Sequence, residues 1–138
     1  MLIALLSVGC ATEVAPAPDS ASPRVDRIEA LGVSGAQERL KEILLRSINP
    51  QVREVDVTDD FFRYSYAEVI MVPTGRTVTN QVAFANAVEV RVHNNNLVQI
   101  LTSAKLVIAQ FVFGNSEDAV MFADLIRSFH TYRKTRST

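Results

Sequence analysis

The sequence predicts one α+β domain in which two amphipathic helices flank about six antiparallel strands. Apolar residues recur with helical spacing at residues 34–48 and again after residue 115. Between these segments apolar and polar residues alternate, which is the period of a half-buried strand. The 138 residues suit a single domain, and a content of 48% hydrophobic and 21% charged residues excludes a disordered chain.

The first helix is expected at residues 34–48. Ser34 is a candidate N-cap, and Gln37 three residues later would complete a capping box. The apolar stripe that would face the core comprises Ala36, Leu40, Ile43, Leu44 and Ile48. Asn49-Pro50 then ends the helix, because proline cannot continue it.

Six strands follow, separated by residues that favour turns. The expected strands are 52–58, 61–72, 77–85, 87–93, 97–102 and 105–113. Turns are expected at Asp59-Asp60, at residues 73–76 and at the three asparagines 94–96, since asparagine tolerates positive φ. Glu68 interrupts the apolar face of the second strand, so we expect a bend or bulge near Ala67.

The last helix is expected to begin at Asn115 or Ser116 as its N-cap. Its apolar stripe comprises Ala119, Phe122, Ala123, Ile126 and Phe129. Arg133, Lys134 and Arg136 gather at its C-terminal end, where the helix dipole favours cations. These three side chains are candidates for contact with an anionic lipid surface, and a solvated helix end is the alternative.

The N-terminus has the pattern of an export signal. An apolar run leads through Gly9 to Cys10, the one cysteine of the chain, and is too short to span a bilayer. This pattern resembles the lipobox of bacterial lipoproteins. The resemblance implies that Cys10 is lipidated on sulfur and becomes the N-terminus after cleavage. The alternative is a cytoplasmic protein with an apolar end and a linker.

The expected organisation follows from these segments. A signal peptide with its lipobox occupies residues 1–10, and a tether rich in proline and alanine occupies residues 11–33. One globular domain spans residues 34–133, and residues 134–138 form a basic tail. We therefore expect a lipid-anchored protein on the extracytoplasmic side of a bacterial membrane, in the cell envelope.

The order of elements in the second half of the chain resembles a pleckstrin-homology-like (PH-like) domain. Residues 82–90 form a short strand, a break and a strand, and Phe111-Val112-Phe113 precedes the helix that opens at Asn115. The hairpin around Asp59-Asp60 resembles the opening hairpin of that family. The resemblance implies a strongly bent antiparallel sheet or barrel whose open end is plugged by the final helix. A cystatin-like helix on a curved sheet is the alternative.

Composition and motifs exclude several function classes. The net charge of −1 argues against a nucleic-acid partner, and one cysteine excludes a disulfide within the chain. The acidic turn at Asp59-Asp60 has the wrong sign for phosphoinositide binding. The sequence contains no glycine-rich phosphate loop, HExxH or CxxC motif, and His93 and His130 are expected to be solvated surface residues. We therefore expect no catalytic residue, no cofactor and no metal site.

These observations predict a non-enzymatic, lipid-anchored binding module of the cell envelope, with a protein partner or other ligand. The alternative is a small-molecule carrier or enzyme that uses the mouth of the curved sheet. The polar groups expected on the inward faces there are Tyr64, Tyr66, Asn80 and Gln110.

Overall fold

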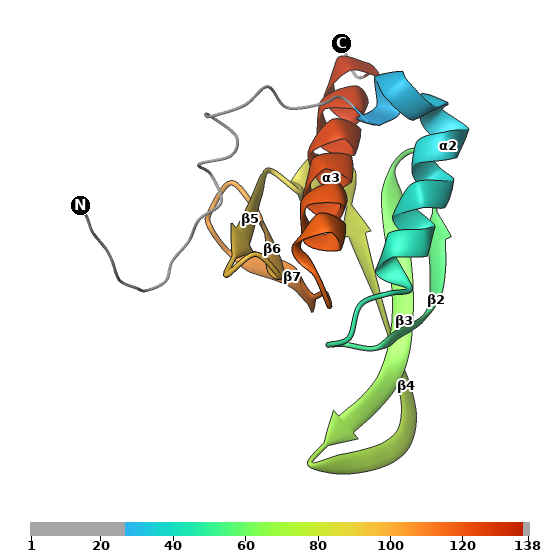
Figure 1. Ribbon diagram of the computed structural model, residues 1–138, viewed down its shortest axis with the longest axis vertical. Coiled ribbons are helices and arrows are strands. Elements are labelled where there is room, and N and C mark those ends of the chain that lie inside the picture. Colours follow the sequence, from blue (N-terminus) through green and yellow to red (C-terminus); the bar gives the residue numbers. More distant parts are fainter. Residues whose placement is uncertain (1–26, 137–138) are drawn as a thin grey trace, which may run out of the picture.

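The protein is an α+β domain, as the sequence predicts. The computed structural model describes residues 27–136 (Figure 1). Its elements, in chain order, are α2 (Arg27–Leu44), β2 (Val52–Val57), β3 (Phe61–Ile70), β4 (Val72–Ala83), the 3-10 helix η1 (Phe84–Asn86), β5 (Glu89–His93), β6 (Leu97–Leu101), β7 (Val107–Val112) and α3 (Ser116–Arg136).

The six strands form two antiparallel sheets, ordered β2-β3-β4 and β5-β6-β7. The expectation of one bent sheet closed toward a barrel is therefore wrong, and the one curved sheet of the cystatin-like alternative is not seen either. The physical reason lies in η1, which takes residues 84–86 out of extended conformation between β4 and β5. In the described part of the chain β4 pairs with β3 and β5 pairs with β6, so no ladder joins the two sheets at this point.

Helix α2 begins earlier and ends earlier than predicted. It starts at Arg27 and contains a kink at Gly32, whose φ of 78° is available to glycine at little cost. Asp124 accepts from Arg27 Nη2 at 3.3 Å, and Arg27 N donates to Ser128 Oγ at 3.2 Å. Residues 27–33 thus belong to the folded domain, whereas the sequence assigned them to the tether.

Helix α3 covers the second sheet and contacts α2, η1, β5 and β6 (Figure 1). The predicted N-cap is confirmed, because Asn115 Oδ1 accepts from Asp118 N at 2.8 Å. The predicted asparagine turn is also confirmed, with φ of 52° at Asn94 and 69° at Asn95. The helix continues to Arg136, so the expected basic tail begins inside it.

The core is built on phenylalanine side chains from both sheets and α3. Phe62 lies at its centre, with ring centroids 5.9 Å from Phe84, 6.3 Å from Phe111 and 6.2 Å from Phe122. Six of the seven phenylalanines are fully buried, namely Phe62, Phe84, Phe111, Phe113, Phe122 and Phe129. Phe62 therefore joins the first sheet to the second sheet and to the helix.

The β3–β4 hairpin projects well beyond the rest of the molecule (Figure 1). The predicted bend is confirmed as a register shift between Ala67 and Val69. The turn itself lies at Met71, because Ile70 pairs with Val72, and not at residues 73–76 as predicted. Gly75 still adopts a positive φ of 84° inside β4, so the turn composition of that segment marks an irregular strand.

Replacing Phe62 by alanine removes the ring that contacts both sheets and α3. We expect Phe62→Ala to lower the free energy of unfolding by about 3–5 kcal/mol, as for other buried aromatic deletions. Urea denaturation followed by circular dichroism measures this. Val120→Ala is the matched control, because Val120 is exposed on α3. Equal losses in the two variants would contradict the central position of Phe62.

Met71 and Gly75 both have positive φ, at 67° and 84°, but only the glycine suits that conformation. We expect Met71→Gly to raise the free energy of unfolding by about 1 kcal/mol and Gly75→Ala to lower it by a similar amount. Thermal denaturation of the two variants beside the parent tests the pair. A destabilised Met71→Gly protein would show that the methionine side chain stabilises the fold.

Candidate functional site

A hollow of about 390 Å³ lies where the gap between the two sheets opens to the surface. Its lining residues are Asn49, Pro50, Tyr64, Tyr66, Asn80, Val107, Ile108, Ala109 and Gln110. They come from the loop before β2, from β3 and β4, and from β7. None of these side chains carries a charge at neutral pH, so the hollow suits an uncharged group.

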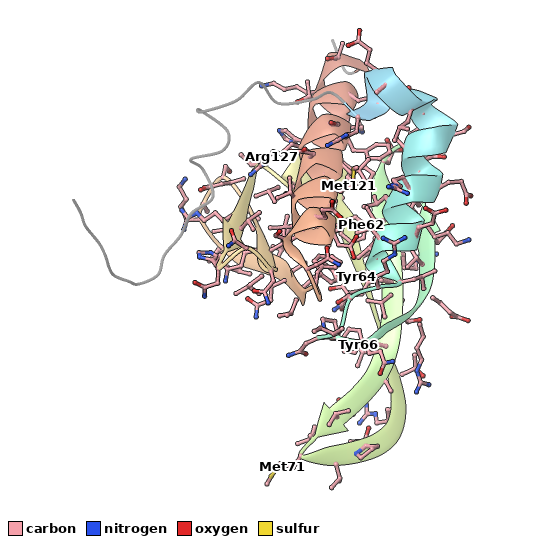
Figure 2. All side chains as sticks on the ribbon, viewed as in Figure 1. Phe62, Tyr64, Tyr66, Met71, Met121 and Arg127 are labelled. Carbon is pink, nitrogen blue, oxygen red and sulfur yellow. The ribbon has the colours of Figure 1, made fainter. Side chains whose placement is uncertain are left out.

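Tyr64 on β3 is the most buried of the residues that line this hollow. Tyr64 is 4% exposed, and its ring stacks on that of Tyr66 with centroids 6.0 Å apart. Figure 2 shows Phe62, Tyr64 and Tyr66 in succession along β3, from the helices toward the projecting hairpin. The phenol ring of Tyr64 also packs edge-on against Phe111, at 4.9 Å between centroids. The hollow therefore borders directly on the aromatic core.

The Tyr64 hydroxyl is held in its neutral form. Burial raises the pKa of Tyr64, while the hydrogen bond from Asn80 Nδ2, at 3.4 Å, acts in the opposite direction. Burial is the larger effect because it removes the water that would stabilise a phenolate. The nearby Tyr66 hydroxyl adds a smaller upward effect on the pKa. Tyr64 can thus offer a hydroxyl donor or acceptor to a ligand throughout the neutral pH range.

The outer edge of β7 forms one side of the hollow. Near its end, Ile48 N donates to Val112 O at 2.8 Å and Val112 N donates to Asn49 O at 3.0 Å. Among residues 27–136, no strand pairs with the rest of this edge, because β7 is the last strand of its sheet. The backbone groups of alternate residues on the same side as Val112, namely Ile108 and Gln110, are therefore available beside the uncharged side chains.

The four polar residues expected at the mouth all line this one hollow. Tyr64 is buried and Tyr66 is half-buried, whereas Asn80 and Gln110 are exposed at the rim. The side chain of Gln110 was expected on the inward face, but it lies on the outer face of the sheet. There its Oε1 accepts from Gln99 Nε2 at 3.1 Å. Sequence reasoning missed the part played by Asn49 and Pro50, which it treated only as the end of a helix.

The other predicted residues lie apart from the hollow or outside the described residues. Cys10 falls outside residues 27–136, so its lipidation stays a prediction. Arg133 Nε lies 2.8 Å from Asp60 Oδ1 in an ion pair, and Lys134 is exposed. Arg136 ends α3, and its side chain is not described. Pairing to Asp60 leaves Arg133 less available to a lipid surface than the sequence suggested.

The two histidines are bonded within the fold and are not freely solvated. His93 Nε2 lies 2.8 Å from Gln99 Oε1 on the outer face of the second sheet. His130 Nδ1 donates to the carbonyl of Phe84 at 2.8 Å and thereby ties α3 to η1. Neither histidine lines the hollow, and both have structural partners.

Two other hollows are lined by charged side chains. One of about 600 Å³ beside β2 and β3 contains Asp56 and Arg63, which pair at 3.6 Å. Another of about 510 Å³ between the helices contains Arg46 and Asp118, which pair at 2.9 Å. Further charged side chains line both hollows, so each would suit a charged or strongly polar group, in contrast to the uncharged hollow.

No group of three or more histidine, cysteine, aspartate or glutamate side chains that could hold a metal ion occurs within the described part of the chain. Neither α2 nor α3 is long and apolar enough to cross a membrane. Comparison of the chain with protein-family models, with curated proteins and with solved structures finds no match.

Burial raises the pKa of Tyr64, so this tyrosine should ionise at a higher pH than an ordinary tyrosine. The absorbance at 295 nm reports phenolate formation, and we expect Tyr64→Phe to remove the part of that signal that appears at the highest pH. The raised pKa also means that the stability due to neutral Tyr64 is full below pH about 10 and is lost as pH rises through the folded pKa. Tyr132→Phe is the control, and loss of the last phase there instead would contradict the assignment.

Proposed function

We propose that this protein is a non-enzymatic binding module of the bacterial cell envelope, anchored by a lipid on Cys10. The uncharged hollow beside the free edge of β7 is the ligand site, and this is the observation that best supports binding as the function. The ligand is an uncharged group with an apolar body, from a peptide or other partner, that can bond to amide and hydroxyl side chains.

The lining chemistry supports binding and argues against catalysis. The titratable side chains of the hollow are those of Tyr64 and Tyr66, and the raised pKa of Tyr64 keeps its hydroxyl neutral. A general base or nucleophile needs a pKa near the working pH or a neighbouring activating group. The lining side chains supply neither, whereas Asn80 and the backbone edge of β7 provide hydrogen bonds that orient a ligand.

A small-molecule carrier is the second candidate. Pockets for small molecules commonly have volumes of roughly 300–1,000 Å³ with few polar groups, and the hollow measures about 390 Å³. The side chains of Tyr64, Tyr66 and Asn80 would then bind a free solute. The two candidates differ in whether the ligand is part of a larger partner, and they share one site.

We also propose that the domain is an open relative of the PH-like fold. In support, an N-terminal sheet is followed by a second antiparallel sheet and then by a helix, and α3 packs on β5 and β6. The acidic turn at Asp59-Asp60 is unlike a phosphoinositide site, because Asp60 pairs with Arg133 and Asp59 Oδ1 accepts from Gln37 Nε2 at 2.8 Å. The proposal therefore covers architecture and not the lipid specificity of the family.

Lipid attachment is tested by growing bacteria that express the chain with radioactive palmitate. We expect label on the protein and its recovery with membranes, and we expect Cys10→Ala to abolish both. Thr12→Ala, in the same segment, is the matched control and should label normally. A Cys10→Ala protein that still incorporates palmitate would overturn the anchor.

Ligand class is tested by nuclear magnetic resonance on the isotope-labelled full chain. Titration with N-acetyl-leucinamide, an uncharged amide with an apolar side chain, should shift the backbone signals of Ile108 and Gln110 at millimolar concentration. Asn80→Trp should fill the rim and remove the shifts, whereas Gln81→Trp, the next residue of β4, should leave them unchanged. Equal shifts with acetate ion would contradict the preference for uncharged groups.

A further inference from the structure

We propose that the end of the β3–β4 hairpin, residues Val69–Val72, inserts into the interfacial region of a lipid bilayer. These four residues, named here the apolar tip, are consecutive and apolar, and Met71 is 98% exposed. Val69, Ile70 and Val72 are also largely exposed, and the hairpin holds them clear of the rest of the molecule (Figures 1 and 2). Such a run on a protein surface indicates an interaction site.

The backbone at the centre of the tip does not favour the residue that is present. Met71 has a φ of 67°, a conformation that glycine or asparagine adopts at lower energy. Its side chain makes little contact with the fold because it is almost completely exposed. Fold stability therefore explains neither the exposure nor the choice of methionine, and strained positions of this kind are often found at binding sites.

The shape of the apolar tip favours a fluid hydrocarbon phase over a groove on a protein. Successive residues of a strand point to opposite faces of the ribbon. Val69 at 63% and Ile70 at 64% exposure therefore present apolar surface on both faces. A groove or a flat partner would cover one face, whereas lipid chains surround a projecting ribbon on all sides.

Polar residues directly behind the tip define how far it can enter. Thr74 Oγ1 donates to Glu68 Oε1 at 2.9 Å and accepts from Arg76 N at 3.2 Å. Arg76 Nε lies 3.8 Å from the same glutamate oxygen, and the arginine side chain is 80% exposed. The polar groups at the bend are thus hydrogen-bonded or paired with one another. Only the apolar tip, between the bend and the turn, lacks polar side chains. Arg76 then lies at the level of the lipid phosphates, where its guanidinium can donate hydrogen bonds.

Insertion of the apolar tip depends on the hairpin alone. It requires neither acylation of Cys10 nor a ligand in the hollow, and it goes beyond the proposed binding function by adding a second contact with the membrane. A test in the full chain carrying Cys10→Ala therefore separates the apolar tip from the anchor, whichever way the palmitate experiment turns out.

The absence of tryptophan from the chain permits a single fluorescent reporter. Cys10→Ala protein with Met71→Trp is mixed with vesicles of phosphatidylcholine, and with vesicles of phosphatidylethanolamine and phosphatidylglycerol at three to one. We expect a blue shift of the emission and quenching by lipids brominated on their acyl chains. Val120→Trp, on the exposed face of α3, is the matched reporter and should show neither.

A second variant controls for membrane affinity introduced by the tryptophan itself. The Cys10→Ala protein without tryptophan should float with vesicles on a density gradient, and adding Ile70→Asp should lower its partition coefficient about tenfold or more. Circular dichroism checks that Ile70→Asp leaves the fold intact. Absence of shift and flotation with both vesicle types would overturn the proposal. A blue shift that rises with protein concentration without vesicles would assign the tip to a second copy of the chain and would overturn it too.

Discussion

The packing of Phe62 against three other phenylalanines is the interaction on which the rest of the domain depends. Its ring lies in β3, and its neighbours come from η1, β7 and α3. The two sheets share no ladder, so the aromatic contacts take over the role that backbone hydrogen bonds have in a continuous sheet. Edge-on and tilted rings suit this role because each ring can contact several partners at once.

The open hollow and the projecting hairpin both follow from this central cluster. Aromatic packing fills the gap between the sheets near the helices and ends at the stacked rings of Tyr64 and Tyr66, where the gap reaches the surface. Farther along β3 the hairpin continues as two strands with no third partner beyond Val52. The same strand thus contributes successively to the core, to the wall of the hollow and to the exposed apolar tip.

Local patterns in the sequence predicted much of this arrangement. The strictly alternating strand β5 and the stripe of α3 lie close to their expected positions, because burial of one face enforces the period. Alternation along the strands also predicted that Tyr64 and Asn80 lie on inward faces at the mouth of the sheet.

The features that could not be predicted depend on partners distant in sequence. The early start of α2 requires Asp124, far along the chain, to bond Arg27. The sequence places a break between strands near Asn86, where η1 lies, but it does not show that the strands on either side belong to different sheets, because that depends on how β4 and β5 pair with other strands. The apolar tip was missed because a run of four apolar residues beside Pro73 looks like the buried end of a strand. Its exposure shows only in three dimensions.

The bonds between the two helices also determine when the chain can fold during synthesis. Arg27 meets Asp124 and Ser128, so the first described helix is completed by the last one. Contacts between distant parts of a chain form late, because closing a long loop costs entropy before it gains any contact. Until α3 leaves the ribosome, the phenylalanines of β3 and β7 lack the helix that covers them. A chain that is exported, as we propose for this one, would therefore stay unfolded and threadable until its C-terminal segment has been made.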